Sequence, residues 1–199
     1  MGEALFQLQA RTLCDAALVL EGVRTAKDLL KQLRRRLSRA TREGVLVGDC
    51  QHLVWQKSAT IEYTDGTHEE VTAIIGGIEI NRERSRELRH FPRADGAWFD
   101  FHIHLGPYTG DDPRLRGSLE LRGYGYEIRF PKDDFDTDIR WLRFDLNHPK
   151  HDNEGRGMRC HFHPGDEDLQ ASSALMQPVE ALELLLSTVL QLPDKRRRS

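Results

Sequence analysis

The sequence predicts an α+β fold in which helices cover one face of an antiparallel sheet. Two helical patterns precede a long run of strand patterns, and one amphipathic helical pattern follows it. No helical pattern separates the strands, and consecutive strands without intervening helices pair antiparallel. We therefore expect a central antiparallel sheet of five to seven strands, with two N-terminal helices and one C-terminal helix.

Length and composition predict one soluble domain. The chain has 199 residues, which suits a single domain with a substantial core. Within this expected domain, 1–199, we place a helical part at 1–43, the sheet at 45–165, a helix at 175–192 and a basic tail at 193–199. No window approaches the roughly 18 consecutive apolar residues that a membrane span needs, so no membrane partner is expected.

Cysteine content and the N-terminus predict a cytoplasmic protein. Cys14, Cys50 and Cys160 are odd in number and far apart, which argues against a disulfide framework and for a reducing compartment. The first residues lack the basic start and continuous apolar block of a secretory signal. The net charge of -3 lacks the basic excess of a dedicated nucleic-acid binder, so nucleic acid is one permitted partner among others.

Two helices are expected before the sheet. Residues 3–20 carry apolar side chains in a mixed helical pattern without Gly or Pro, and Gly22 ends it. Thr25 is placed to cap a second helix, with Asp28 in the capping-box position. Apolar residues then follow helical spacing as far as Gly44, so this helix buries one side.

The other side of the second helix is strongly cationic. Its cations are Lys31, Arg34, Arg35, Arg39 and Arg42. Such a surface suits an acidic protein partner, and it also suits the phosphates of nucleic acid, whose contacts make binding salt-dependent. A solvated helix face explains the same charges. No aromatic residues interleave the arginines, which favours the solvated face or a protein partner over nucleic acid.

Alternating polar and apolar residues predict the strands. Asp65-Gly66 between two such runs is a strong hairpin signal. Further strands are expected over 98–105, 115–130 and 139–146. Gly123 and Gly125 are expected to break the second of these. After the last strand, an amphipathic pattern entered through Pro178 predicts the C-terminal helix.

The best candidate site occupies two short stretches, 143–151 and 159–165. Its titratable side chains are Arg143, Asp145, His148, His151, Arg159, His161 and His163. Alternation along a strand places Arg143 and Asp145 on one face, and it places Arg159, His161 and His163 on a common face in the same way. A polar, glycine-rich loop that holds His148 and His151 beside a rigid strand is a usual place for functional groups.

Two His-x-His pairs, His102/His104 and His161/His163, offer a metal site. On strands, residues two apart point to the same face, and adjacent strands would gather four imidazoles. Imidazoles bind zinc, iron, nickel or copper, and a carboxylate such as Asp145 would complete an open site. The other interpretation of His102 and His104 is the solvated side of a half-buried strand.

The same residues suit RNA cleavage without a metal. Two histidines beside a phosphodiester take a proton from the ribose 2′-hydroxyl and give one to the leaving oxygen, while arginine neutralises the phosphate. His161 and His163 are then the acid–base pair, and Asp145 orients one imidazole. Arg143 and Arg159 hold the phosphate. Cross-strand pairs that only stabilise the sheet, by about 0.2–1 kcal/mol each, explain the same pattern.

A run of motifs extends over residues 142–189. Leu-Arg-Phe-Asp at 142–145 precedes a His-rich polar loop, His-Phe-His-Pro-Gly follows at 161–165, and an amphipathic helix enters through Pro178. This order resembles the C-terminal part of the TumE-like proteins, toxin components of bacterial toxin–antitoxin pairs. The resemblance implies that the protein acts on RNA, that an antitoxin is its partner, and that Asp145, His161 and His163 match the family's pattern.

We therefore expect a toxin- or defence-associated protein that cleaves RNA as a metal-independent endoribonuclease with histidine acid–base chemistry and no cofactor. Two alternatives stay open. One is a non-catalytic interaction module that binds a protein or nucleic acid through the basic helix. The other is a metal-binding protein that holds a transition metal such as zinc at its His-x-His pairs.

Overall fold

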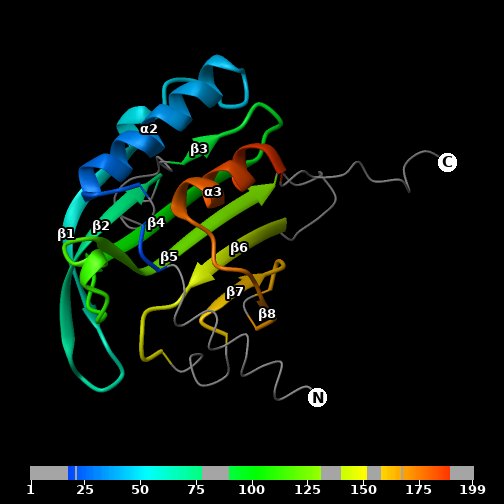
Figure 1. Cartoon of the computed structure of the whole chain (residues 1–199). Helices are drawn as coiled ribbons and strands as arrows, with labels where there is room; N and C mark the ends of the chain where they lie inside the picture. Colours follow the sequence, from blue (N-terminus) through cyan, green and yellow to red (C-terminus); the bar gives the residue numbers. More distant parts are fainter. Residues whose placement is uncertain are drawn as a thin grey trace.

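An antiparallel sheet organises the fold, and both helices lie against one of its faces (Figure 1). The computed structural model describes residues 18–20, 22–77, 90–130, 140–151, 158–166 and 168–188. The strands are β1 (Val54–Glu62), β2 (His68–Gly76), β3 (Phe91–Pro92), β4 (Trp98–Pro107), β5 (Leu119–Phe130), β6 (Arg140–Leu146), β7 (Cys160–His163) and β8 (Ala171–Ser172). Their order across the sheet is β1-β2-β4-β5-β6-β7-β8, with β3 beside β4.

The predicted α+β class with an antiparallel sheet is confirmed, with a difference in the number of strands. Eight strands form where five to seven were expected. The additional strands include β3 and β8, which have two residues each. A strand of two residues is too short to show an alternating pattern, so periodicity in the sequence does not reveal it.

The side chains of β4 show how the sheet separates a buried face from a polar face. Phe99, Phe101 and Ile103 are at most 1% exposed and belong to the core beneath the helices. Asp100 and His102 alternate with them along the strand, so they point to the opposite face, where they are half-buried. The core therefore lies on the helix side of the sheet, and the polar face lies on the other side.

Helix α2 (Ala26–Arg42) begins at the predicted cap. The Asp28 backbone N–H donates to Thr25 Oγ1 at 3.1 Å, and the Thr25 backbone N–H donates to the Asp28 carboxylate at 3.0 Å. These reciprocal contacts form a capping box, which satisfies N–H groups that have no partner within the helix. The buried side of α2 consists of Leu29, Leu33, Leu37 and Ala40.

Helix α3 (Pro178–Glu183) starts at the predicted entry proline, three residues after the expected bound at 175, and continues as a π-helical turn, η4 (Leu184–Thr188). Tyr126 of β5 donates its hydroxyl hydrogen to the Pro178 carbonyl at 3.0 Å. Arg36 of α2 forms an ion pair with Glu183, so α3 is joined to both the sheet and α2. The predicted extension of this helix to residue 192 passes beyond the described residues.

One helix precedes the sheet in the part of the chain that the structure describes, rather than two. Most of the expected first helix, residues 3–17, lies outside that part. Residues 18–20 are extended instead, and the Leu20 N–H donates to the Leu119 carbonyl at 3.0 Å. The prediction of helix to residue 20 is wrong because Leu18 and Leu20 also have the two-residue spacing of a strand. No helix in the described ranges is long and apolar enough to cross a membrane.

Strand β5 runs without a break from Leu119 to Phe130, so the expected interruption at its glycines is wrong. Gly123 and Gly125 stay paired with β4, opposite His104 and His102 respectively. A glycine within a strand pattern marks either the end of a strand or a place where a neighbouring group approaches closely. Here the two glycines face the polar side of the sheet and leave room for imidazole rings.

Candidate metal centre

Polar side chains line up across four strands on the polar face. His102 of β4 pairs with Gly125 of β5, which pairs with Asp145 of β6. Asp145 in turn pairs with His161 of β7. Directly opposed residues of antiparallel strands share a face, so these side chains form one row. The next row consists of Asp100, Glu127, Arg143 and His163. The polar faces of β6 and β7 therefore meet, which any site formed by both stretches requires.

Asp145, His161 and His163 form a close cluster between β6 and β7. The Nε2 atoms of the two histidines are 3.2 Å apart. Asp145 Oδ2 lies 3.4 Å from His163 Nε2 and 3.7 Å from His161 Nε2. Both imidazoles are 2% exposed. Among the described residues, this is the one group of His, Cys, Asp or Glu in which three possible ligand atoms all lie within 4.8 Å of one another.

The other nitrogen of each imidazole, Nδ1, forms a hydrogen bond to a backbone carbonyl. His161 Nδ1 lies 2.9 Å from the Met158 carbonyl oxygen, and His163 Nδ1 lies 3.2 Å from that of Asp166. A carbonyl oxygen only accepts hydrogen bonds, so both Nδ1 atoms carry a hydrogen. In the neutral rings, the Nε2 lone pairs then face each other and the carboxylate. Such an arrangement is repulsive unless a proton or a cation lies between the atoms.

Arg143 supplies one cation beside this cluster. Its Nε donates to Asp145 Oδ2 at 2.7 Å, and its Nη2 lies 3.1 Å from His163 Nε2. The guanidinium also lies over the Trp141 ring, 5.5 Å from the ring centroid. Arg143 therefore neutralises Asp145 and engages one imidazole, whereas the described neighbours of His161 Nε2 are the two acceptors, His163 and Asp145.

A second group of histidines lies on the same face toward β4. His104 Nδ1 is 2.7 Å from His148 Nε2, and the rings of His102 and His104 are 5.4 Å apart. A Cβ at Gly125 would lie 2.5 Å from His102 Cε1 and 3.1 Å from Asp145 Oδ1. The space above this glycine thus holds both the His102 ring and the second oxygen of Asp145, which brings the two groups close together.

The structure does not gather the four histidines of the His-x-His pairs into one site. They share a face, as predicted, but β5 and β6 separate β4 from β7. Consecutive strands tend to be neighbours in a sheet, so strands that intervene in the sequence also intervene in space. His102 and His104 are therefore on a strand that β5 and β6 separate from that of His161 and His163, so His102 approaches the Asp145 carboxylate without joining the cluster of Asp145, His161 and His163.

Burial shifts the titration of this face. It lowers the pKa of His102 to about 4 and that of His148 to about 4, and neighbouring histidines add to both shifts. Burial also lowers the pKa of His161. Asp100 shifts in the other direction, because burial and then Glu127 raise its pKa to about 7. With pKa values of about 4, His102 and His148 are neutral at neutral pH.

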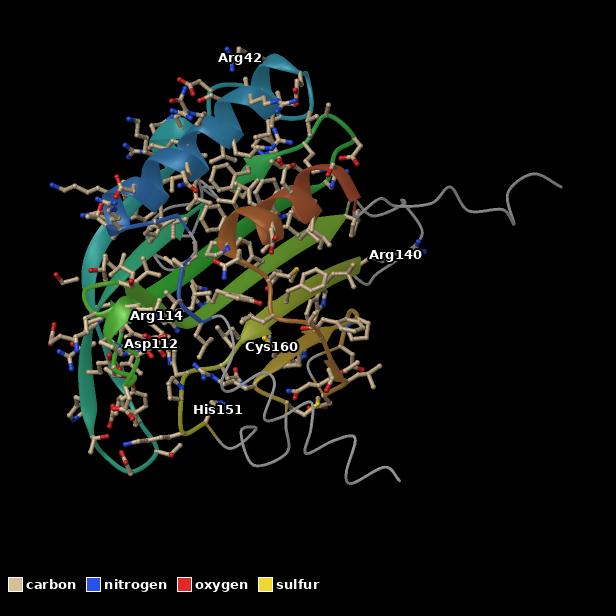
Figure 2. The ribbon with its side chains drawn as sticks, in the orientation of Figure 1. Arg42, Asp112, Arg114, Arg140, His151 and Cys160 are labelled. Atoms are coloured by element: carbon tan, nitrogen blue, oxygen red, sulfur yellow. The ribbon has the colours of Figure 1, made fainter. Side chains whose placement is uncertain are left out.

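The other predicted members of the site lie outside the cluster. Arg159 is 6% exposed, and it donates to the Asn147 carbonyl at 3.0 Å and to the Arg122 carbonyl at 3.4 Å. These contacts tie neighbouring chain segments together, so they do not support its predicted role of holding phosphate. His151 is exposed in the loop after β6, as Figure 2 shows. Cys160 is buried in the core, because alternation along β7 turns its side chain to the helix side of the sheet.

The predicted cationic face of α2 lies on the helix side of the sheet, away from this cluster. Arg39 pairs with Glu43 at 2.7 Å, and Arg42 is exposed at the end of the helix (Figure 2). Lys31, Arg34 and Arg35 line a groove beside β1. The cationic face of α2 and the histidine cluster, both of which the sequence predicts as candidate functional surfaces, are therefore separate in the structure.

Two features of the centre were missed in the sequence. The carbonyls of Met158 and Asp166 orient the imidazoles, but no residue pattern predicts the direction of a backbone carbonyl beside a four-residue strand. Gly125 did carry a signal. An isolated glycine within a strand pattern indicates close approach by another group, and pairing it with the His102 strand would have indicated which group.

Fold and centre together define an α+β protein with a buried His-His-Asp cluster on the polar face of an antiparallel sheet. Comparison of the chain with known proteins gives no match to a family model, to a curated protein or to a solved structure. The resemblance to TumE-like proteins therefore stays a prediction that rests on the C-terminal motifs.

Proposed function

We propose that the protein binds a divalent transition metal, zinc or ferrous iron, through Asp145, His161 and His163. The supporting observation is the convergence of the two Nε2 atoms and Asp145 Oδ2, with separations of 3.2, 3.4 and 3.7 Å. Two imidazoles and one carboxylate form a donor set that both metals accept, and three protein ligands leave a position open for water.

The hydrogen bonds around the cluster support the same proposal. A histidine that binds a metal generally donates its other N–H to a carbonyl or carboxylate, which fixes the ring and its tautomer. The carbonyls of Met158 and Asp166 take this role for His161 and His163. Both rings are thus oriented in advance, and a metal would replace lone-pair repulsion with coordination.

The position of the Arg143 guanidinium favours a substrate with negative charge. Its Nη2 faces His163 Nε2 at 3.1 Å, so a bound metal must displace this one contact. The guanidinium would keep its position beside Asp145 and over Trp141, next to the residues that would hold the metal. A planar guanidinium binds phosphate oxygens in pairs, so an anionic ester fits this position.

The proposed reaction is hydrolysis of a phosphodiester, with RNA as the substrate to test first. The metal would lower the pKa of its bound water so that hydroxide forms near neutral pH. Arg143 would neutralise the charge that develops on the phosphate. The choice of RNA rests on the resemblance of residues 142–189 to TumE-like toxins.

Metal content tests the centre directly. Purified protein dialysed after incubation with zinc or ferrous iron should retain about one equivalent, because three ligands are already oriented. The variants Asp145→Ala, His161→Ala and His163→Ala should each retain less than about a tenth of an equivalent. Elemental analysis measures both quantities.

His102→Ala is the matched control for metal content. It removes a histidine from the same face but not from the cluster, so it should keep the metal. A wild-type protein that retains no more metal than His161→Ala, with each metal offered in turn, would show that the cluster is not a metal centre.

RNA cleavage with and without a chelator distinguishes the metal centre from the metal-free alternative. Metal-free histidine catalysis is the second candidate, favoured by the contact that places Arg143 on the histidine pair. If the metal acts, a chelator should abolish cleavage of an end-labelled single-stranded RNA, and one equivalent of zinc should restore it. If the histidines act alone, the chelator changes nothing while His161→Ala still abolishes cleavage.

Arg143→Gln separates substrate binding from metal binding in the same assay. It should keep the metal and lower the rate of RNA cleavage by about 100-fold, the usual loss when one charged donor to a transition state is removed. Absence of cleavage by the metal-loaded wild type would reject RNA as the substrate and leave the metal centre to the elemental analysis.

A further inference from the structure

A groove of about 550 Å³ lies between helix α2 and the beginning of strand β1. It is lined by Lys27, Leu30, Lys31, Arg34 and Arg35 of α2, Gln51 of the short helix η1 (Gln51–Leu53), and Gln56 of β1. Four of these side chains are cationic and none is acidic. Gln56 pairs with Ile74, on the helix side of the sheet, so the groove and the candidate metal centre lie on opposite faces.

The groove runs along a free strand edge. β1 is the end strand of the sheet, and within the described ranges no strand pairs with its outer edge. The Leu53 carbonyl accepts from Gly77 N–H at 3.1 Å and therefore points toward β2. Alternation then directs the backbone groups of Val54, Gln56 and Ser58 away from β2, toward the open edge.

Arg34 shows that the cations of α2 reach this edge. Its Nε and Nη2 lie 3.2 and 2.6 Å from the Val54 carbonyl oxygen, which is the first outward-facing acceptor of β1. The neighbouring acceptors and donors of Gln56 and Ser58 continue the same line. The groove thus combines a row of backbone hydrogen-bonding groups with a row of cations.

The spacing of the cations suits an extended chain. Lys27, Lys31 and Arg35 follow each other at every fourth residue, so they cover about 12 Å along the helix axis. Alternate side chains of an extended segment are roughly 7 Å apart and point to one side, so acidic residues at alternate positions would face this row. Backbone pairing with a sheet edge gives such a segment affinity, and charge gives it specificity.

We infer that this groove binds an acidic, extended segment of a partner protein, added as a further strand beside β1. A nucleic acid fits the groove less well, because its lining has no aromatic side chain on which a base would stack. The site is independent of the metal centre. Its occupant would be held at a surface remote from the proposed chemistry.

Calorimetric titration with a synthetic peptide tests this inference. The probe is an acetylated eight-residue peptide in which glutamate and valine alternate, and the control peptide has glutamine in place of glutamate. We expect the full-length protein to bind the first peptide at least about tenfold more tightly, because only this peptide carries charge complementary to the groove. Binding of the acidic peptide should weaken with added salt.

Two pairs of variants locate the binding. The double variant Lys31→Glu, Arg35→Glu reverses two exposed cations of the groove and should lower the affinity by about tenfold or more. Arg39→Glu with Arg42→Glu is the matched control, because it makes the same charge change on the same helix outside the groove. Equal losses in both doubles would overturn the inference.

The strand edge has its own test. Ser58→Pro removes an outward-facing N–H and should weaken peptide binding, whereas Ser58→Ala should not. Thermal unfolding identifies any loss caused by misfolding, and Lys27→Glu then serves as a second groove variant. His161→Ala should bind the peptide like the wild type, so failure of the metal centre and failure of the groove are distinguishable.

Two further outcomes would replace the partner protein. Tighter binding of a single-stranded RNA of equal charge, lost in the Lys31→Glu, Arg35→Glu variant, would assign the groove to nucleic acid. Sedimentation of the protein alone as a dimer that this variant dissociates would assign it to a second copy of the chain. Either result overturns the inference.

Discussion

Ionisation of the Asp100 carboxyl destabilises the folded protein near neutral pH. Burial, and after it the carboxylate of Glu127, raise its pKa from 3.8 to about 7. Between these values the unfolded chain has lost the proton that the folded chain still holds. The contribution of protonated Asp100 to the free energy of unfolding is therefore fully present below pH 3.8. It decreases as pH rises from 3.8 to about 7.

Asp100→Asn should remove this loss. The variant should exceed the wild type in free energy of unfolding by on the order of 2 kcal/mol at about pH 8, and the two should be equal near pH 3.5. Urea unfolding at both pH values measures the difference. An equal gain at both values would mean that the side chain, and not its charge, is responsible.

Asp112→Asn is the control for charge removal. Asp112 caps the short 3-10 helix η2 (Pro113–Leu115) and pairs with Arg114, and Figure 2 labels both residues. Hydrogen bonds from Arg114 lower the pKa of Asp112, which is the reverse of the shift at Asp100. This variant should gain no stability at pH 8.

Strand β5 is adapted to the polar face by the absence of side chains at two positions. A Cβ at position 125 would lie 2.5 Å from His102 Cε1, closer than carbon atoms can approach without displacement. Gly125→Ala should therefore lower the free energy of unfolding by about 1–3 kcal/mol. Urea unfolding checks the change.

A double-mutant cycle tests the cause of that loss. His102→Ala removes the ring that the new methyl group would meet, so the double variant should be less destabilised than the sum of the single changes. His104→Ala is the control, because His104 lies opposite Gly123 and not Gly125. Additivity with His102→Ala would show that the ring moves aside at no cost.

Helix α2 was the best predicted element, for reasons that are local. Thr25 and Asp28 are three residues apart, which is the geometry of the capping box, and the spacing of Leu33, Leu37 and Ala40 defines the buried side. Residues 18–20 were mispredicted because their partners, residues 119–121, are about a hundred residues away in the chain. Local patterns do not carry such pairings.

Across the whole molecule, alternation predicted which side chains share a face, but not how the strands are ordered. It correctly placed Arg143 with Asp145 and His161 with His163. It did not reveal that two strands separate His102 from His161, because the order depends on hydrogen bonds between distant segments. The polar face was thus predictable, whereas its division into two histidine groups was not.

The shortness of β7 gives a bound cation a mechanical role. β7 has four residues and β8 two, so few backbone hydrogen bonds fasten this corner to the rest of the sheet. An ion bound by Asp145, His161 and His163 would link β6 to β7 and so stabilise their pairing. Local unfolding of β7 and β8 should therefore become less frequent when the metal is bound. Their resistance to proteolysis should rise with metal concentration and fall when the metal is removed.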